Sequence, residues 1–164
     1  EALAGGATIL QLREKNKSTM EYIELAEKVH ELTRKYNVPL IIDDRIDVAL
    51  AVGAEGVHLG KEDMPIDSAR KILGNNKIIG AICAAPTILG KFGLLEGKSF
   101  SCYPGMESQI EEGIYSEKPV SFDDVFITGE AMGASFEFGF KLCEITMGKD
   151  AAEKVKNEIC YKKQ

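Results

Sequence analysis

Residues 77–86 read KIIGAICAAP. The apolar residues before Cys83 predict a short buried strand, and Pro86 is typical of the first turn of a helix. Small residues flank Cys83 at the turn, as in a nucleophile elbow that exposes a side chain above a sheet. A thiol at a helix N-terminus is also favoured as the thiolate by the helix dipole. The stretch predicts an α/β fold with Cys83 as candidate nucleophile, although a small buried cysteine is the alternative.

Strands alternate with helices on both sides of this stretch, which is the pattern of a parallel sheet. The central strands are expected at residues 8–12, 38–42, 56–60, 77–82 and 125–128. Ser18 and Glu21 have the spacing of a capping box, and Gly53 is placed to end a helix over 46–52. Residues 114–117 and 120–122 are expected to form a small antiparallel arm.

Composition limits the class of protein. The 164 residues carry a formal charge of −6 with a pI near 5.1, which disfavours nucleic acid and anionic membranes as partners. No apolar run approaches the ~18 residues of a membrane span, and no signal peptide is evident. Four irregularly spaced cysteines predict free thiols. These features predict a soluble protein of cytoplasmic type.

Charged side chains follow the first three expected strands. Gln11, Arg13 and Lys15 follow the first strand, residues 43–44 are two aspartates, and residues 61–63 read KED. The carboxyl ends of parallel strands meet at one edge, where ligands bind. Carboxylates there suit magnesium, and the basic residues suit phosphate. Solvated loop charges are the alternative.

Several motifs in residues 1 to about 80 resemble thiamin phosphate synthase, a (β/α)8-barrel enzyme. They are GGAT, QLREK, IIDD and GVHLGKED, which begin at residues 5, 11, 41 and 56. The resemblance covers barrel strands two to five. It implies that Gln11, Arg13 and Lys15 bind the pyrophosphate of a pyrimidine substrate, and that Asp44 and Asp63 bind magnesium.

Residues from about 75 to 164 resemble the flavodoxin-like ThiJ/PfpI family, of class I amidotransferase type. The matching motifs are AICAAPT, GKS, CYPG, ITG and ASFEF, which begin at residues 81, 97, 102, 127 and 134. The resemblance implies that Cys83 is the family's reactive, oxidation-sensitive cysteine, while Tyr103 stands where some members have histidine. Of the two histidines, His30 is expected to be a bystander on a helix and His58 to be satisfied in the core.

These observations predict one chimeric α/β domain over 1–164, with a barrel-derived fragment at 1–80 and a ThiJ/PfpI-derived fragment at 81–164. We expect a flavodoxin-like three-layer sandwich around a mainly parallel five-stranded sheet. Strand order 1-2-3-4-5, the habit of barrels, is favoured over the flavodoxin-like 2-1-3-4-5.

The change from one resemblance to the other near residues 75–80 predicts an engineered or recombined chimera that tests the relatedness of the TIM-barrel and flavodoxin-like folds. No physiological catalysis is expected of it. One alternative is residual glyoxalase, deglycase or redox-sensing activity through Cys83. The other is weak magnesium–pyrophosphate binding by the synthase-like loops. No cofactor is expected apart from magnesium with pyrophosphate or phosphate, and the expected partners are small anions and a second copy of the chain.

Overall fold

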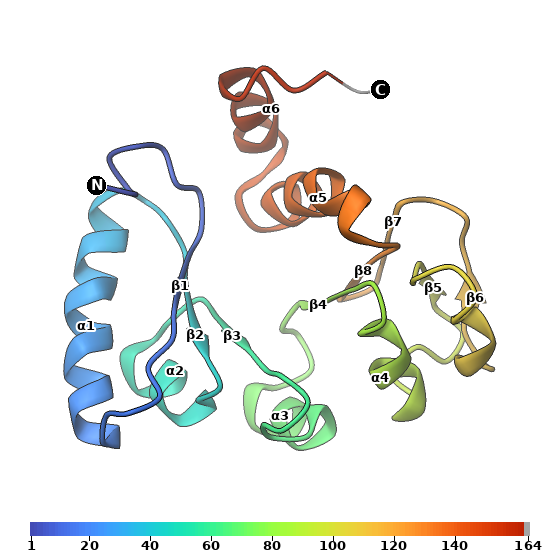
Figure 1. Ribbon diagram of the computed structural model, residues 1–164, viewed down its shortest axis with the longest axis horizontal. Helices are drawn as coiled ribbons and strands as arrows, with labels where there is room; N and C mark the ends of the chain where they lie inside the picture. The colour runs from blue at the N-terminus through green and yellow to red at the C-terminus, as the bar shows by residue number, and fades with distance from the viewer. Residues whose placement is uncertain (163–164) are drawn as a thin grey trace. The chain divides into compact units, whose positions relative to one another are not determined.

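The computed structural model describes residues 1–162, which divide into two compact units, residues 1–72 and residues from 73 onward (Figure 1). The predicted single domain over 1–164 stays a prediction. Among the described residues, no helix is long and apolar enough to cross a membrane.

The first unit is a parallel sheet in the order β1-β2-β3, with helices between the strands. Its elements are β1 (Leu10–Leu12), α1 (Thr19–Lys35), β2 (Leu40–Asp43), α2 (Ile46–Val52), β3 (Gly56–His58) and, reaching one residue past the boundary, α3 (Ile66–Leu73). The expected order 1-2-3-4-5 is therefore confirmed for the first three strands only, because the fourth, at 79–82, pairs with a strand of the second unit and not with β3.

Local signals explain where these helices begin and end. The Ser18 hydroxyl accepts from the Glu21 amide at 3.3 Å, and the Glu21 carboxylate accepts from the Ser18 amide at 2.9 Å, so the capping box is confirmed. Gly53 ends α2 with a left-handed φ of 66°. Both helices pack on β2, and the core between them consists of Tyr22, Ala26, Leu40, Ile42, Val48 and Ala49.

The second unit holds two further sheets. Its elements are β4 (Ile79–Ile82), α4 (Pro86–Lys91), β5 (Ser99–Phe100), η1 (Glu107–Gln109), β6 (Ile114–Tyr115), β7 (Val120–Asp123), β8 (Phe126–Gly129), η2 (Met132–Ala134), α5 (Ser135–Met147) and α6 (Lys149–Glu158). Strand β8 is buried along its whole length, pairs in parallel with β4 and antiparallel with β7, and is covered by α5. A Cβ atom on Gly129 would lie 3.0 Å from Phe138 Cδ2, so the glycine makes room for this helix.

The expected five-stranded sheet is wrong, because the strands within residues 1–162 form three separate hydrogen-bonded sheets. The expected antiparallel arm is wrong as well. Strand β6 pairs in parallel with β5, and β7 forms a hairpin with β8 through a two-residue turn at Asp124, whose φ is 55°. Apolar patterning locates strands, but contacts between distant segments choose their partners.

Candidate functional site

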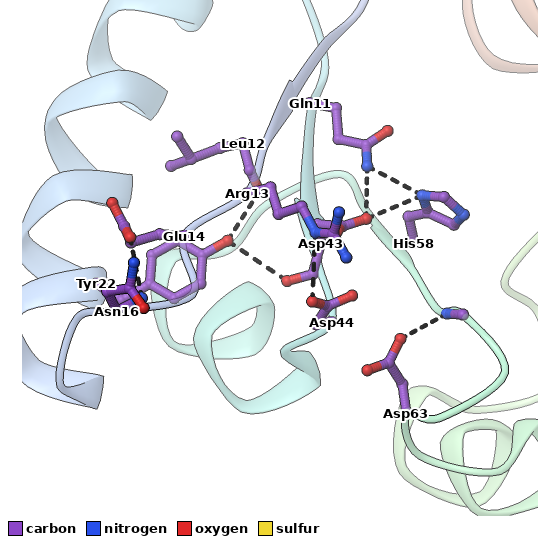
Figure 2. A network of polar contacts seen from close by, with 11 residues as sticks. Gln11, Leu12, Arg13, Glu14, Asn16, Tyr22, Asp43, Asp44, His58 and Asp63 are labelled. Atoms are coloured by element: carbon purple, nitrogen blue, oxygen red, sulfur yellow. Dashed lines mark hydrogen bonds and ion pairs between the residues drawn. The ribbon is translucent and has the colours of Figure 1, made fainter.

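A network of polar side chains lies at the carboxyl ends of β1, β2 and β3 (Figure 2). The strand register produces it: Gln11 is paired with Ile41, and Asp43 with His58. Because side chains alternate between the two faces of a sheet, Gln11, Ile41, Asp43 and His58 share the face opposite Leu40 and Ile42. The apolar core thus fixes the register that gathers the polar residues.

Asp43 is the central acceptor of this network and only 4% exposed. Its Oδ1 accepts a hydrogen bond from Gln11 Nε2 at 2.5 Å and lies 2.9 Å from His58 Nδ1. Its Oδ2 forms an ion pair with Arg13 Nε at 2.6 Å. A buried carboxylate is stable when it is paired and hydrogen-bonded. Both oxygens of Asp43 therefore orient side chains from β1 and β3.

Asp44 and Asp63 supply two more carboxylates at this edge. Asp44 has a left-handed φ of 67°, its amide donates to the His58 carbonyl at 2.9 Å, and its Oδ2 lies 3.5 Å from Arg13 Nε. The Asp63 Oδ2 accepts from the Gly60 amide at 2.6 Å. These contacts engage only Oδ2 of each carboxylate among the described residues.

The donor set fits magnesium. Within residues 1–162, no group of three or more His, Cys, Asp and Glu side chains could hold a metal by itself. Magnesium usually takes one or two carboxylates and fills its other positions with water and phosphate. Asp44, whose Oδ2 lies 3.5 Å from Arg13 Nε, and Asp63 in the loop after β3 are therefore the carboxylates suited to magnesium that arrives with a phosphate.

Tyr22 of α1 supports the network from the core. Its hydroxyl donates to the Leu12 carbonyl at 2.8 Å and lies 3.4 Å from the Asp43 carbonyl. Burial, followed by the negative charge of Asp43, raises the pKa of Tyr22 above its ordinary value. The phenol therefore stays protonated and ties the ends of β1 and β2 together.

The network includes some, but not all, of the residues expected from sequence. Gln11, Arg13 and Asp44 belong to it, Asp63 lies in the next loop, and Lys15 is exposed in the loop after β1. Their roles in binding stay predictions.

The expectation for His58 was wrong, whereas that for His30 stays a prediction. His58 is not satisfied in the core: its side chain is 61% exposed. The alternation of polar positions in β1 and β2 was the signal that could have placed it beside Asp43. His30 is buried on α1, where its ring nitrogens contact the Val52 carbonyl at 3.0 Å and Glu55 Oε1 at 3.1 Å, so its contacts are structural.

Cys83 lies in the second unit, directly after β4 and three residues before α4. Its φ is 65°, in a region that non-glycine residues rarely adopt. The Cys83 amide donates to the Gly129 carbonyl at 3.0 Å, and the Tyr103 amide donates to the Cys83 carbonyl at 2.8 Å. The strand–turn–helix geometry of an elbow is therefore present, held by backbone hydrogen bonds on both sides.

Sequence comparison finds relatives of the N-terminal part of the chain. The model of the thiamine monophosphate synthase family matches residues 1–91. The thiamine-phosphate synthase of Clostridium novyi is 61% identical over 80 residues, which cover 49% of this chain and 39% of that enzyme. The chain thus spans about two fifths of the length of these curated relatives.

Structural comparison finds two kinds of neighbour. A DJ-1 superfamily protein from Salmonella typhimurium has a TM-score of 0.60 at 17% identity, over 94% of this chain and 98% of that one. The thiamine phosphate pyrophosphorylase of Pyrococcus furiosus has a TM-score of 0.52 at 28% identity, over 95% of this chain and 84% of that one. The synthase-like resemblance is confirmed, and the DJ-1/ThiJ/PfpI resemblance is confirmed as a likeness of fold.

The expectation of a chimera without physiological catalysis is contradicted by these findings. It rested on the barrel strands that this chain does not match. Residues 1–91 nevertheless match the model of the family, and one relative named thiamine-phosphate synthase is 61% identical over 80 residues. The motifs that resemble the synthase lie together at one strand edge of the first unit.

Proposed function

Because the chain belongs to the thiamine monophosphate synthase family, whose model matches residues 1–91, we propose that its first unit forms the magnesium- and diphosphate-binding edge of a thiamine-phosphate synthase. The observation that carries this proposal is Arg13, held at the end of β1 by the buried Asp43 at 2.6 Å. The ion pair engages Arg13 Nε, so the two terminal nitrogens of the guanidinium are left to bind a phosphate oxygen pair.

Each residue at this edge has a defined part in binding. Arg13 and Lys15 neutralise charge on the diphosphate, and the Gln11 amide, fixed by Asp43, lines the site beside them. Asp44 and Asp63 hold magnesium, which when bound withdraws charge from the diphosphate oxygens and so makes the diphosphate a better leaving group. The binding residues thereby stabilise the negative charge that develops as the diphosphate departs.

Calorimetry with inorganic pyrophosphate tests the proposal. We expect binding in the presence of MgCl2, and an Arg13→Gln variant that binds about 10- to 100-fold more weakly, since a hydrogen bond to a charged group contributes roughly 1.5–3 kcal/mol. Asp44→Asn should weaken the magnesium-dependent part. Arg34→Gln removes a charge from the last turn of α1, at its other end, and serves as the matched control. Absence of binding by the unaltered chain with magnesium would refute the proposal.

The architecture that supports this function combines, in our proposal, a barrel-type fragment over 1–80 with a flavodoxin-like fragment over 81–164 in one domain. The two kinds of structural neighbour support this combination. We expect a single cooperative unfolding transition, with the same midpoint reported by Tyr22 in the first unit and by Tyr115 in the second. Two separate transitions would contradict it.

Cys83 is a second candidate site, and its left-handed backbone favours it. We propose that it is a reactive cysteine, since strain of this kind persists where the surrounding structure over-determines it. Mass spectrometry after brief iodoacetamide treatment should show Cys83 alkylated before the exposed Cys160. Faster labelling of Cys160 would leave Cys83 without special reactivity and overturn the proposal.

A further inference from the structure

His58 has the features of a residue that contacts a ligand. Its backbone forms the last residue pair between β2 and β3, with Asp43, while its side chain is 61% exposed at the strand edge. The inner ring nitrogen, Nδ1, lies 2.9 Å from Asp43 Oδ1 and 2.9 Å from Gln11 Nε2. Figure 2 shows both contacts on the same side of the ring, with the other side turned away from Asp43. The imidazole is thus held from its inner side only.

The hydrogen bonds determine what the outer nitrogen offers. The Gln11 amide nitrogen carries two hydrogens, one for Asp43 Oδ1 at 2.5 Å and one for His58 Nδ1. When Nδ1 accepts this hydrogen, the ring hydrogen is on Nε2. In the other neutral form the ring hydrogen is on Nδ1 and can be donated to Asp43 Oδ1, but it then occupies the position that accepts the second hydrogen of the Gln11 amide. Only the form with the hydrogen on Nε2 gives both Gln11 hydrogens an acceptor within this group of three side chains. In that form the outer nitrogen is a donor.

We infer that His58 is a further ligand-contacting residue, whose Nε2–H donates a hydrogen bond to an oxygen of the bound diphosphate. The inference rests on the proposed function of the first unit and adds a donor from β3 to those of Arg13 and Lys15. Asp43 then acts as a positioning residue for two strands at once, through Oδ2 to Arg13 and through Oδ1 to His58. Exposure of the ring in the free protein is the condition for such a contact.

Two substitutions separate ligand contact from structural support. Asparagine at position 58 places a polar group where the inner nitrogen lies and has nothing at the outer position, so His58→Asn keeps the link to Asp43 and Gln11. Glutamine reaches the outer position with an amide donor, so His58→Gln keeps the ligand contact. Pyrophosphate binding is measured by calorimetry at a fixed MgCl2 concentration, and thermal unfolding of each variant is followed in parallel.

We expect His58→Asn to unfold like the unaltered chain and to bind pyrophosphate about tenfold more weakly, while His58→Gln stays within about threefold. Equal binding by His58→Asn and the unaltered chain would overturn the inference, and so would a loss shared by both variants to the same extent. If Arg13→Gln weakens binding and His58→Asn does not, the proposed function stands and only the role of His58 fails. If the unaltered chain does not bind pyrophosphate, both fail.

Discussion

Replacing Cys83 by glycine should make the protein more stable than replacing it by alanine. Cys83 has a φ of 65°. A left-handed conformation costs a residue with a Cβ atom roughly 1–2 kcal/mol, and glycine avoids this cost. Glycine also loses more backbone entropy on folding, and this cost offsets about 0.5–1 kcal/mol of the stabilisation. The net advantage of Cys83→Gly over Cys83→Ala is therefore about 0.5–1 kcal/mol.

Cys143 provides a control of opposite sign, because it lies inside α5, where glycine is about 1 kcal/mol less favourable than alanine. Urea unfolding of the four variants measures both differences, and the difference between the two sites should reach about 1.5–2 kcal/mol. If alanine is the more stable residue at both positions, Cys83 is not left-handed in solution and the argument for a strained elbow fails.

Three further substitutions test the described contacts. Ser18→Ala should lower the free energy of unfolding by about 1 kcal/mol, measured in urea, because it removes the N-cap of α1. Gly113→Ala should lower it by about 1–3 kcal/mol, since the added Cβ would lie 2.6 Å from Cε1 of the buried Phe100 ring. Burial opposes ionisation of Glu55, but hydrogen bonds from the first amide of β2 and from His30 outweigh it and lower the pKa of Glu55. Its contribution to stability is therefore present above the unfolded-state pKa and lost as the pH falls through the lower folded-state value. Glu55→Gln should accordingly flatten the stability profile on the acid side of the ordinary glutamate pKa of about 4.3.

The elements that sequence predicts well are those set by neighbours along the chain. Ser18 and Glu21 are three residues apart, and Gly53 directly follows the last apolar turn of α2, so their hydrogen bonds and backbone angles follow from local chemistry. Cys83 belongs to the same class, because strand, small residues and proline lie within ten positions.

Pairings between distant segments could not be predicted in the same way. Strand β7 pairs with β8 because Asp124 tolerates the left-handed conformation in the turn between them. In the sequence, two adjacent aspartates are only a weak signal for that turn. The site shows both cases. Sequence placed Gln11 and Arg13 beside the aspartates. The contact of His58 with Asp43, however, depends on the register of β2 and β3, and a shift of one residue would place the His58 side chain on the other face of the sheet.

The charges at the strand edge lead to one more prediction, that magnesium and pyrophosphate each increase the affinity of the chain for the other. The strand edge and its loops carry three carboxylates, from Asp43, Asp44 and Asp63, and two cations, Arg13 and Lys15, of which Arg13 is already paired with Asp43 at 2.6 Å. A diphosphate alone therefore approaches a region of its own sign, and a divalent cation reverses the balance. Linkage requires the two affinity gains to be equal once the association of magnesium with pyrophosphate in free solution is subtracted. Calorimetric titration of each ligand in the absence and presence of the other measures both gains, with Asp44→Asn expected to reduce the two together. Pyrophosphate that binds equally well without magnesium would show that the basic residues alone determine the site.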